Sequence, residues 1–290
     1  GGAPNIKNVF DPEREEPGTP GPLSFVFRSE NQRHFVGAFA QDQISLGEKW
    51  DFVVGLRYDY LEEETADGVP DPQPQPDQVD HGLSPNVGVV FRPVPEVALY
   101  ATWSRSFQPI NGVPVDENGD VLDPEIATLY ETGIKWQPFG ERLTATGAFY
   151  YILLEDRQSF VDIGGGSFFP RNLGEVESLG FETDIVGEIT PGWSVVAAYA
   201  YNDSEITEDG DPAIEGNRPA DIPAHNARLW SYYRLQDGPL RGFGLGGGVT
   251  WVGDRFGDDA NTFEFDSYTR WDAAVSYERG GWTARVKFEN

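Results

Sequence analysis

The sequence predicts an all-β protein: an antiparallel up-and-down transmembrane β-barrel, of which the chain supplies about twelve strands. Three observations predict this class. Apolar and polar residues alternate along most of the chain, the connections alternate in length, and tryptophans gather beside the short connections. Alternation with a period of two residues is typical of a strand that has one apolar and one polar face.

The alternation is clearest in "WDFVVGLRYDYLEEE", Trp50 to Glu64. Twelve segments show it, and none has a sustained period of 3.6 residues. They lie near residues 34–45, 50–62, 81–92, 96–107, 125–136, 142–155, 173–189, 193–205, 224–235, 240–253, 265–278 and 282–289. The chain has no apolar run of about 18 residues, so a transmembrane helix is not expected.

The connections between these segments are short and long in turn. The short ones are residues 46–49, 93–96, 137–141, 190–192, 236–240 and 279–281. The long ones are residues 61–80, 108–124, 156–172, 206–223 and 254–264. Membrane barrels have short periplasmic turns and longer extracellular loops, which explains the alternation. A soluble Greek-key sandwich gives no reason for it.

Tryptophans mark the level of the short connections. Trp50, Trp193 and Trp282 directly follow a short connection, and Trp136 directly precedes one. Membrane barrels carry aromatic girdles at both water interfaces, so these four residues are expected in one girdle. Trp251 and Tyr201, toward the long connections, are expected at the other.

Each strand is therefore expected to have a lipid face and a lumen face. Outward positions include Val54, Ala197 and Ala273, whereas Gly55, Arg57, Asp59, Arg270 and Asp272 are expected to face a wet lumen. A soluble acidic β-sandwich stays open as the alternative. The mean hydropathy of −0.45 does not decide between them, because only half of each barrel strand need be apolar.

Composition excludes several other classes. The formal net charge of the 290 residues is −27, from 48 acidic and 21 basic side chains, which argues against a nucleic-acid partner. The chain has no cysteine, so disulfides and thiolate metal sites are excluded. It has no methionine either, and the pattern breaks off in a strand, so we expect an internal piece of a longer protein.

Several stretches resemble the C-terminal barrel of TonB-dependent outer-membrane siderophore receptors of the ferrichrome-receptor type. They include "FVGAFAQDQISLGEKWDFVVGLRYDYLE" (35–62), "VALYATWSRSFQP" (97–109) and "LDPEIATLYETGIKWQP" (122–138). Further matches are residues 173–207, 216–235 and 252–278, so the resemblance covers nearly the whole chain from about residue 34.

This resemblance implies a 22-stranded barrel that is plugged by a separate N-terminal domain. Residues 1–290 would then be a partial barrel domain, about strands 10–21, with the plug and the last strand not present. Both outer strands would lack a lateral neighbour, and we expect an open, curved sheet rather than a closed ring of twelve, because strand tilt and shear suit the larger circumference.

The implied function is uptake of ferric siderophores across the bacterial outer membrane by TonB-coupled active transport. The implied partners are the ferric siderophore, the TonB–ExbB–ExbD complex acting through the missing plug, and outer-membrane lipid and lipopolysaccharide around a monomer. The siderophore is cargo, and no cofactor is expected. A receptor for another solute, such as cobalamin or an oligosaccharide, and a soluble acidic β-sandwich binding protein are the alternatives.

Motifs for enzyme or metal chemistry are weak. "GFGLGG" (242–247) matches a nucleotide-binding pattern, but a strand follows it where a helix is required, so small residues on a crowded strand face are the simpler interpretation. His34, His81 and His225 are scattered and predict no metal site. The acidic turns at 116–120, 207–212 and 257–261 lack a complete calcium loop. We therefore expect no enzyme.

Aromatic and polar residues in the long connections are the candidates for ligand binding. Aromatic rings with a few polar groups can line a pocket for a bulky, oxygen-rich chelate, and an arginine would bind an anionic one. Packing of loop against loop is an equally good interpretation. The candidates are Gln108, Asn111, Arg157, Phe160, Phe168, Phe169, Arg171, Arg255 and Phe256, with Phe107 and Phe263 beside them.

Overall fold

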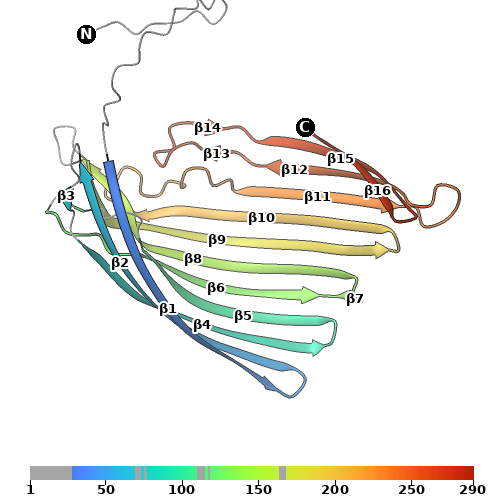
Figure 1. The fold of residues 1–290 in the computed structure, drawn as a ribbon, viewed down its shortest axis with the longest axis horizontal. Coiled ribbons are helices and arrows are strands. Elements are labelled where there is room, and N and C mark those ends of the chain that lie inside the picture. The colour runs from blue at the N-terminus through green and yellow to red at the C-terminus, as the bar shows by residue number, and fades with distance from the viewer. Residues whose placement is uncertain (1–27, 69–72, 75–76, 110–114, 117, 163–167) are drawn as a thin grey trace, which may run out of the picture.

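Twelve long strands form one antiparallel meander in the computed structural model, which describes residues 28–68, 73–74, 77–109, 115–116, 118–162 and 168–290 (Figure 1). Each strand pairs with its neighbour along the chain. In order they are β1 (Arg28–Leu46), β2 (Trp50–Gly68), β4 (Gln78–Val94), β5 (Val97–Gln108), β6 (Glu125–Trp136), β8 (Leu143–Asp162), β9 (Phe168–Thr190), β10 (Trp193–Glu208), β11 (His225–Arg234), β12 (Phe243–Val252), β15 (Tyr268–Arg279) and β16 (Trp282–Glu289).

Four short strands lie in the connections: β3 (Gln73–Pro74), β7 (Pro138–Glu141), β13 (Arg255–Phe256) and β14 (Glu264–Phe265). β3 pairs with β2, and β13 pairs with β14 in a small separate hairpin. No helix in the described ranges is long and apolar enough to cross a membrane.

The twelve long strands match the twelve predicted segments one for one, but two predicted loops are wrong in extent. Much of 61–80 and 156–172 is strand, because β2 continues to Gly68 and the β8–β9 hairpin continues to Asp162 and Phe168. A tilted strand needs only about 9–11 residues to span a bilayer. The 19 residues of β2 therefore exceed that need, and its end beyond Tyr60 stands above the bilayer with the start of β4.

The two ends of the sheet differ, as the alternation of the connections predicts. The short turns lie together at the right-hand rim in Figure 1, and the long connections lie at the opposite rim. Trp50, Trp136, Trp193 and Trp282 are each the first or last residue of a strand at a short turn. We call these two ends the short-turn rim and the long-loop rim.

The two faces of the sheet also differ. Val54 and Ala273 are exposed, whereas their neighbours Gly55 and Asp272 are buried, in agreement with the predicted facing. Curvature crowds the side chains of the concave face, which reduces their exposure. That face carries ion pairs between Arg57 and Asp59 (2.7 Å) and between Arg270 and Asp272 (3.2 Å).

The outward face is apolar and has no protein partner within the described residues. Its aromatic rings pack on one another across strands, as Trp50 does with Phe91 (4.4 Å between centroids) and Phe149 with Phe181 (4.8 Å). Among the described residues, only five hydrophobic side chains are buried: Leu61, Leu122, Val176, Ile206 and Ala274. A soluble sandwich would bury its apolar face against a second sheet, so that alternative is wrong.

A second aromatic group lies near the long-loop rim on the same outward face. The imidazole of His225 is 5.0 Å from the ring of Tyr201 and 6.2 Å from that of Trp251, between centroids. Tyr199 Oη lies 2.9 Å from His225 Nδ1. This places Trp251 and Tyr201 where the second girdle is predicted.

Gly244, Gly246 and Gly247 of "GFGLGG" lie in β12 (Phe243–Val252), so a strand stands where the nucleotide-binding motif requires a helix. Lack of space for a side chain explains Gly244 and Gly246 instead. A Cβ on Gly244 would fall 2.1 Å from Tyr232 Oη, and Cβ atoms on Gly246 and Gly248 would meet the indole of Trp230 at 2.8 and 2.5 Å. The two rings from β11 thus occupy the space that side chains on these β12 residues would need, which confirms the interpretation of a crowded strand face.

The described sheet is open, as predicted. β1 pairs only with β2, and β16 only with β15. Every residue of β16 is exposed, and so is every residue of β1 from Glu30 onward.

Candidate functional site

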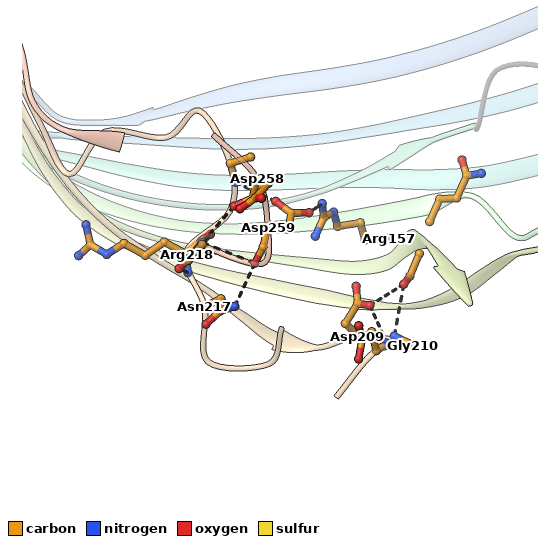
Figure 2. A network of polar contacts seen from close by, with 12 residues as sticks. Arg157, Asp209, Gly210, Asn217, Arg218, Asp258 and Asp259 are labelled. Carbon is orange, nitrogen blue, oxygen red and sulfur yellow. Dashed lines mark hydrogen bonds and ion pairs between the residues drawn. The ribbon is translucent and has the colours of Figure 1, made fainter. Parts of the chain in front are cut away.

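At the long-loop rim, side chains join the long connections to one another. Three segments meet there: the β8–β9 arm (155–162 with 168–175), the 206–223 loop and the 253–267 loop. Chain outside regular ladders must bond its own polar groups or water, and here the loops bond one another. Figure 2 shows this network, which we call the rim network.

Arg157 and Asp259 form the centre of the rim network. Arg157 Nη2 donates to Asp259 Oδ2 over 2.5 Å, which ties the β8–β9 arm to the 253–267 loop (Figure 2). Asp259 Oδ1 accepts from the backbone N–H of Ala220 at 2.8 Å, which adds the 206–223 loop. One carboxylate therefore holds three segments.

Two asparagines reinforce the link between the loops. Asn217 Nδ2 donates to the carbonyl of Asp259 at 3.1 Å. Asn261 Oδ1 accepts from the N–H of Arg218 at 3.1 Å, while Asn261 Nδ2 donates to the carbonyl of Arg218 at 2.8 Å. Asn261 has a φ of 54°, a left-handed conformation that asparagine tolerates better than most residues.

A second contact joins the arm to the start of the 206–223 loop. Ser159 is buried, and its Oγ donates to Asp209 Oδ1 at 2.7 Å. The same Oγ accepts from the N–H of Gly210 at 3.3 Å (Figure 2). Ile206, three residues before Asp209, is fully buried.

A bulge in the arm holds the 115–124 segment. The β8–β9 register shifts between Leu154 and Arg157, where Asp156 has a φ of 58°. Asn172 Nδ2 donates to the carbonyls of Asp156 (2.7 Å) and Asp123 (2.8 Å), and Asn172 Oδ1 accepts from the N–H of Asp123 (2.8 Å). Bulges re-aim a strand, and this one brings Arg157 to the loops.

Electrostatics favour the charged form of Asp259. Burial raises the pKa of its carboxyl, but the hydrogen bonds from Ala220 and Arg157 and the positive charge of Arg157 outweigh that effect, so the pKa lies below the ordinary 3.8. Asp259 is therefore charged at neutral pH, as its ion pair with Arg157 requires.

The acidic turns use their carboxylates locally. Asp116 Oδ1 accepts from the N–H groups of Asn118 (2.8 Å) and Asp120 (2.9 Å). The hydrogen bond from Asp120 is the largest cause that lowers the pKa of Asp116. Asp258 accepts likewise from the N–H of Thr262 at 2.8 Å. No group of three or more His, Asp or Glu side chains in the described ranges could hold a metal ion.

The structure brings some of the predicted ligand residues together. Arg157 and Phe160 lie on the arm, and Phe160 is 61% exposed. Phe168, Phe169 and Arg171 lie on the facing strand, in register with Asp162, Val161 and Ser159; the side chains of Phe168 and Phe169 lie outside the described part, as does all of Asn111.

Gln108 lies at the end of β5 and is exposed. It is in register with Glu125 of β6, whose Oε1 accepts from the N–H of Gln158 in the arm at 3.3 Å. Gln108 therefore lies two strands from the arm.

Arg255 and Phe256 line a cleft of about 360 Å³ beside the 253–267 loop. Its other walls include His225, Trp251 and Ile222, so it opens above the second girdle. The guanidinium of Arg255 lies 4.9 Å from the ring centroid of Phe265, and its Nε donates to Asp221 Oδ1 at 3.4 Å. This cleft is separate from the Arg157–Asp259 contact.

Sequence reasoning missed the partners that hold the rim network together. They are Ser159, Asn172, Asp209, Asn217, Asp259 and Asn261. The turn "GDDAN" (257–261) drew attention only as a possible calcium site. Its pairing with Arg157, 102 positions away, left no signal in the local sequence.

Comparisons with known proteins agree with this architecture. The family model described as "TonB dependent receptor-like, beta-barrel" matches residues 5–290. The chain is 33% identical over 276 residues to the "Ferrichrome outer membrane transporter/phage receptor" of Escherichia coli K12, covering 94% of this chain and 35% of that protein. It is 32% identical to the "Metal-pseudopaline receptor CntO" of Pseudomonas aeruginosa, covering 86% of this chain and 36% of the relative.

Among solved structures, the siderophore receptor PiuA of Acinetobacter baumannii superposes with a TM-score of 0.77 at 26% identity, over 87% of this chain and 38% of that one. The chain thus spans about a third of the length of the curated relatives it matches. These relatives are receptors and transporters rather than enzymes, and they belong to the outer membrane. By its family match and its topology, the chain belongs to the β-barrels of the TonB-dependent receptors.

Proposed function

We propose that this chain forms part of the wall and mouth of a receptor that takes up ferric siderophores by TonB-coupled active transport. Iron would pass through as cargo inside its chelate. The observation that carries the proposal is the rim network: long loops fold into one bonded rim above a polar wall. The names of the ferrichrome, ferrioxamine and siderophore receptors among its relatives support it.

The unpaired edges support a larger barrel. Backbone groups at a sheet edge cannot stay unpaired in hydrocarbon. We therefore place residues 1–290 as about strands 10–21 of a 22-stranded barrel, with an N-terminal plug and a last strand supplied elsewhere in the protein, and with lipid and lipopolysaccharide around the outer wall.

The predicted ligand residues remain the candidates for contact with the chelate, with different roles. Phe160 and Phe256 offer rings, and Gln108 offers an amide at the mouth. Nη1 of Arg157 is a buried donor without a hydrogen-bond partner among the described residues, which suits an oxygen of a ligand. Asn111, Phe168, Phe169, Arg171 and Arg255 complete the set.

Another metal chelate is the second candidate, because one relative is named a metal-pseudopaline receptor. A cobalamin or oligosaccharide receptor has less support from the named relatives. A growth assay separates these classes: cells that carry the full-length receptor should gain iron from a supplied ferric chelate, and a gain only with other metals or solutes would favour a second candidate.

Binding to the purified full-length receptor tests the site itself. Phe160→Ala and Phe256→Ala should each weaken binding of a ferric siderophore about tenfold, as loss of an aromatic anchor does. Phe139→Ala is the matched control, since Phe139 is 49% exposed at the short-turn rim. Cells without TonB should bind the chelate but not take it up. Equal effects of all three variants, or uptake without TonB, would contradict the proposal.

A further inference from the structure

The negative charge of the chain is concentrated at one rim. The five long connections defined by the sequence contain 22 acidic and four basic side chains, a net charge of −18 over 83 residues. The six short connections contain four acidic and two basic ones, a net charge of −2 over 24 residues. One net negative charge thus falls on about every five residues of the long connections and on every twelve of the short ones.

The few arginines at the long-loop rim do not offset this charge toward an incoming ligand. Arg157 pairs with Asp259, Arg218 with Asp203 (2.8 Å) and Arg255 with Asp221 (3.4 Å). Each guanidinium is directed at a carboxylate of the same rim. The connections 61–80 and 108–124 contain eleven acidic side chains and no basic one.

A buried group independently indicates a missing donor. Gln78 is 1% exposed and lies in register with Glu63 on the neighbouring strand. Its Nε2 donates to Asp80 Oδ2 at 2.6 Å, while its Oε1 is buried without a hydrogen-bond partner in the described part of the chain. The neighbouring Glu63 accepts from Arg33 and Asn31 of β1, so the Gln78 oxygen is the acceptor here that has no donor among the described residues.

The carboxyl of Asp80 also has other acidic side chains near it. It stands above the bilayer at the start of β4, where burial raises the pKa of its carboxyl. The charges of Asp123 and Glu63 raise this pKa further, against the hydrogen bond from Gln78 and the charge of His81, which lower it. Since these groups form no metal-binding cluster among the described residues, a bare metal ion is not the expected complement. The expected complement is a ligand that carries an ammonium group, which is both a cation and a hydrogen-bond donor.

Charge distinguishes the common types of ferric chelate. Three catecholates, each with two negative charges, leave the ferric complex trianionic. Three hydroxamates leave it neutral, and a pendant ammonium group makes it cationic. A mouth of one sign raises the local concentration and association rate of the opposite sign by about ten- to a thousandfold, an effect that salt screens.

We propose that this mouth selects cationic ferric hydroxamates with a pendant ammonium group over anionic ferric tricatecholates. The inference rests on the proposed function. Arg157, Arg218 and Arg255 each pair with a carboxylate of the rim, and Nη1 of Arg157 stays available for a neutral hydroxamate oxygen. The net negative charge of the mouth then sets the preference between chelates of different charge. A neutral ferric hydroxamate should bind with an affinity between those of the two.

The test uses the full-length receptor and three probes. The first is a ferric trihydroxamate with a free ammonium group, the second is the same chelate with that amine acetylated, and the third is a ferric tricatecholate. The cationic chelate should bind about tenfold more tightly than its acetylated form at low salt, with the gap closing at high salt. The tricatecholate should bind most weakly.

Charge-neutralising variants locate the effect. The triple variant Asp77→Asn, Asp123→Asn and Glu215→Gln changes exposed residues of the long-loop rim and should abolish most of the preference for the cationic chelate. Unchanged affinity for the acetylated chelate would show that its mouth is folded. The matched control, Glu48→Gln, Glu96→Gln and Glu141→Gln, alters the short-turn rim and should leave the preference intact.

Two results would overturn the inference while leaving the proposed function in place: tricatecholate binding as tight as that of the cationic chelate, or an unchanged preference in the long-loop triple variant. Failure of all three ferric chelates to bind would instead overturn the proposed function, and the inference with it.

Discussion

The two rims of this sheet differ in structure although the same strands connect them. The short-turn rim reverses the chain in a few residues, and its tryptophans sit at strand ends facing outward. The long-loop rim carries the excess charge and joins the 206–223 loop, the 253–267 loop and the β8–β9 arm through Asp259 and Ser159. The regular strands and short turns thus define the wall, and the long-loop rim is where we propose that the chelate binds.

The largest effect on stability is expected in the wall between the rims, where one face of the sheet meets lipid and the other meets the lumen. Val53 and Val54 are adjacent and identical, but only Val54 faces outward, where it is 51% exposed. Val54→Arg should destabilise the full-length receptor by about 2–4 kcal/mol, because it places a charge in lipid. Val53→Arg faces the lumen and should cost much less. Folding into lipid vesicles in a urea series measures both.

Val53 is a better control than Gly55, the inward neighbour on the other side. A Cβ at Gly55 would fall 2.5 Å from Asn86 Nδ2, so a substitution there would add steric strain to any effect of charge. Equal costs for Val53→Arg and Val54→Arg would refute the assignment of the two faces.

The rim network should be weaker than the wall but should act across all three of its segments. Asp259→Ala removes the partner of Arg157 and of the Ala220 N–H, and should lower local stability by about 1.5–3 kcal/mol. Hydrogen exchange should rise together in the 206–223 and 253–267 loops. Glu264→Ala, an exposed change in the same loop, is the control. A rise confined to 253–267 would mean that the loops are independent.

Acid should open the same network reversibly. Because the folded pKa of Asp259 lies below 3.8, its stabilising effect is fully present above that pH and is lost as the pH falls through the lower, folded value. Spin labels on Glu215→Cys and Ala260→Cys should keep a fixed separation from pH 7 to about pH 5 and broaden only in stronger acid. In Asp259→Asn, broadening at neutral pH is expected; an acid-sensitive distance in that variant would contradict the role of Asp259.

The smallest expected effect concerns the short-turn rim. Trp50→Leu removes the ring that stacks on Phe91 and should cost about 0.5–1.5 kcal/mol beyond the lost apolar area. It should not alter binding of any chelate. A change in chelate affinity would show that the two rims are coupled.

The sequence predicted the strands and faces of the wall but not the contacts of the rim network, and the reason is physical. Facing, strand order and the tryptophan levels depend on residues next to each other in the chain, as in 50–60, and period-two alternation reports them directly. The ends of the long strands were predicted too early. Above the bilayer both faces of β2 carry polar residues such as Glu62 and Glu64, so the apolar–polar alternation stops while the backbone pairing with β1 continues. The contact between Arg157 and Asp259 depends on a bulge and on two loops far apart in sequence, which no local pattern encodes.

Which rim faces the outside is the most direct test of the account. The chain contains no cysteine, so single introduced cysteines can be compared within it. In intact cells that carry the full-length receptor, a membrane-impermeant maleimide should label Glu215→Cys at the long-loop rim at once. Glu48→Cys, at the short-turn rim, should react only after the outer membrane is opened. The reverse order of labelling, or equal labelling of both sites in intact cells, would contradict the assignment of the long-loop rim as the mouth.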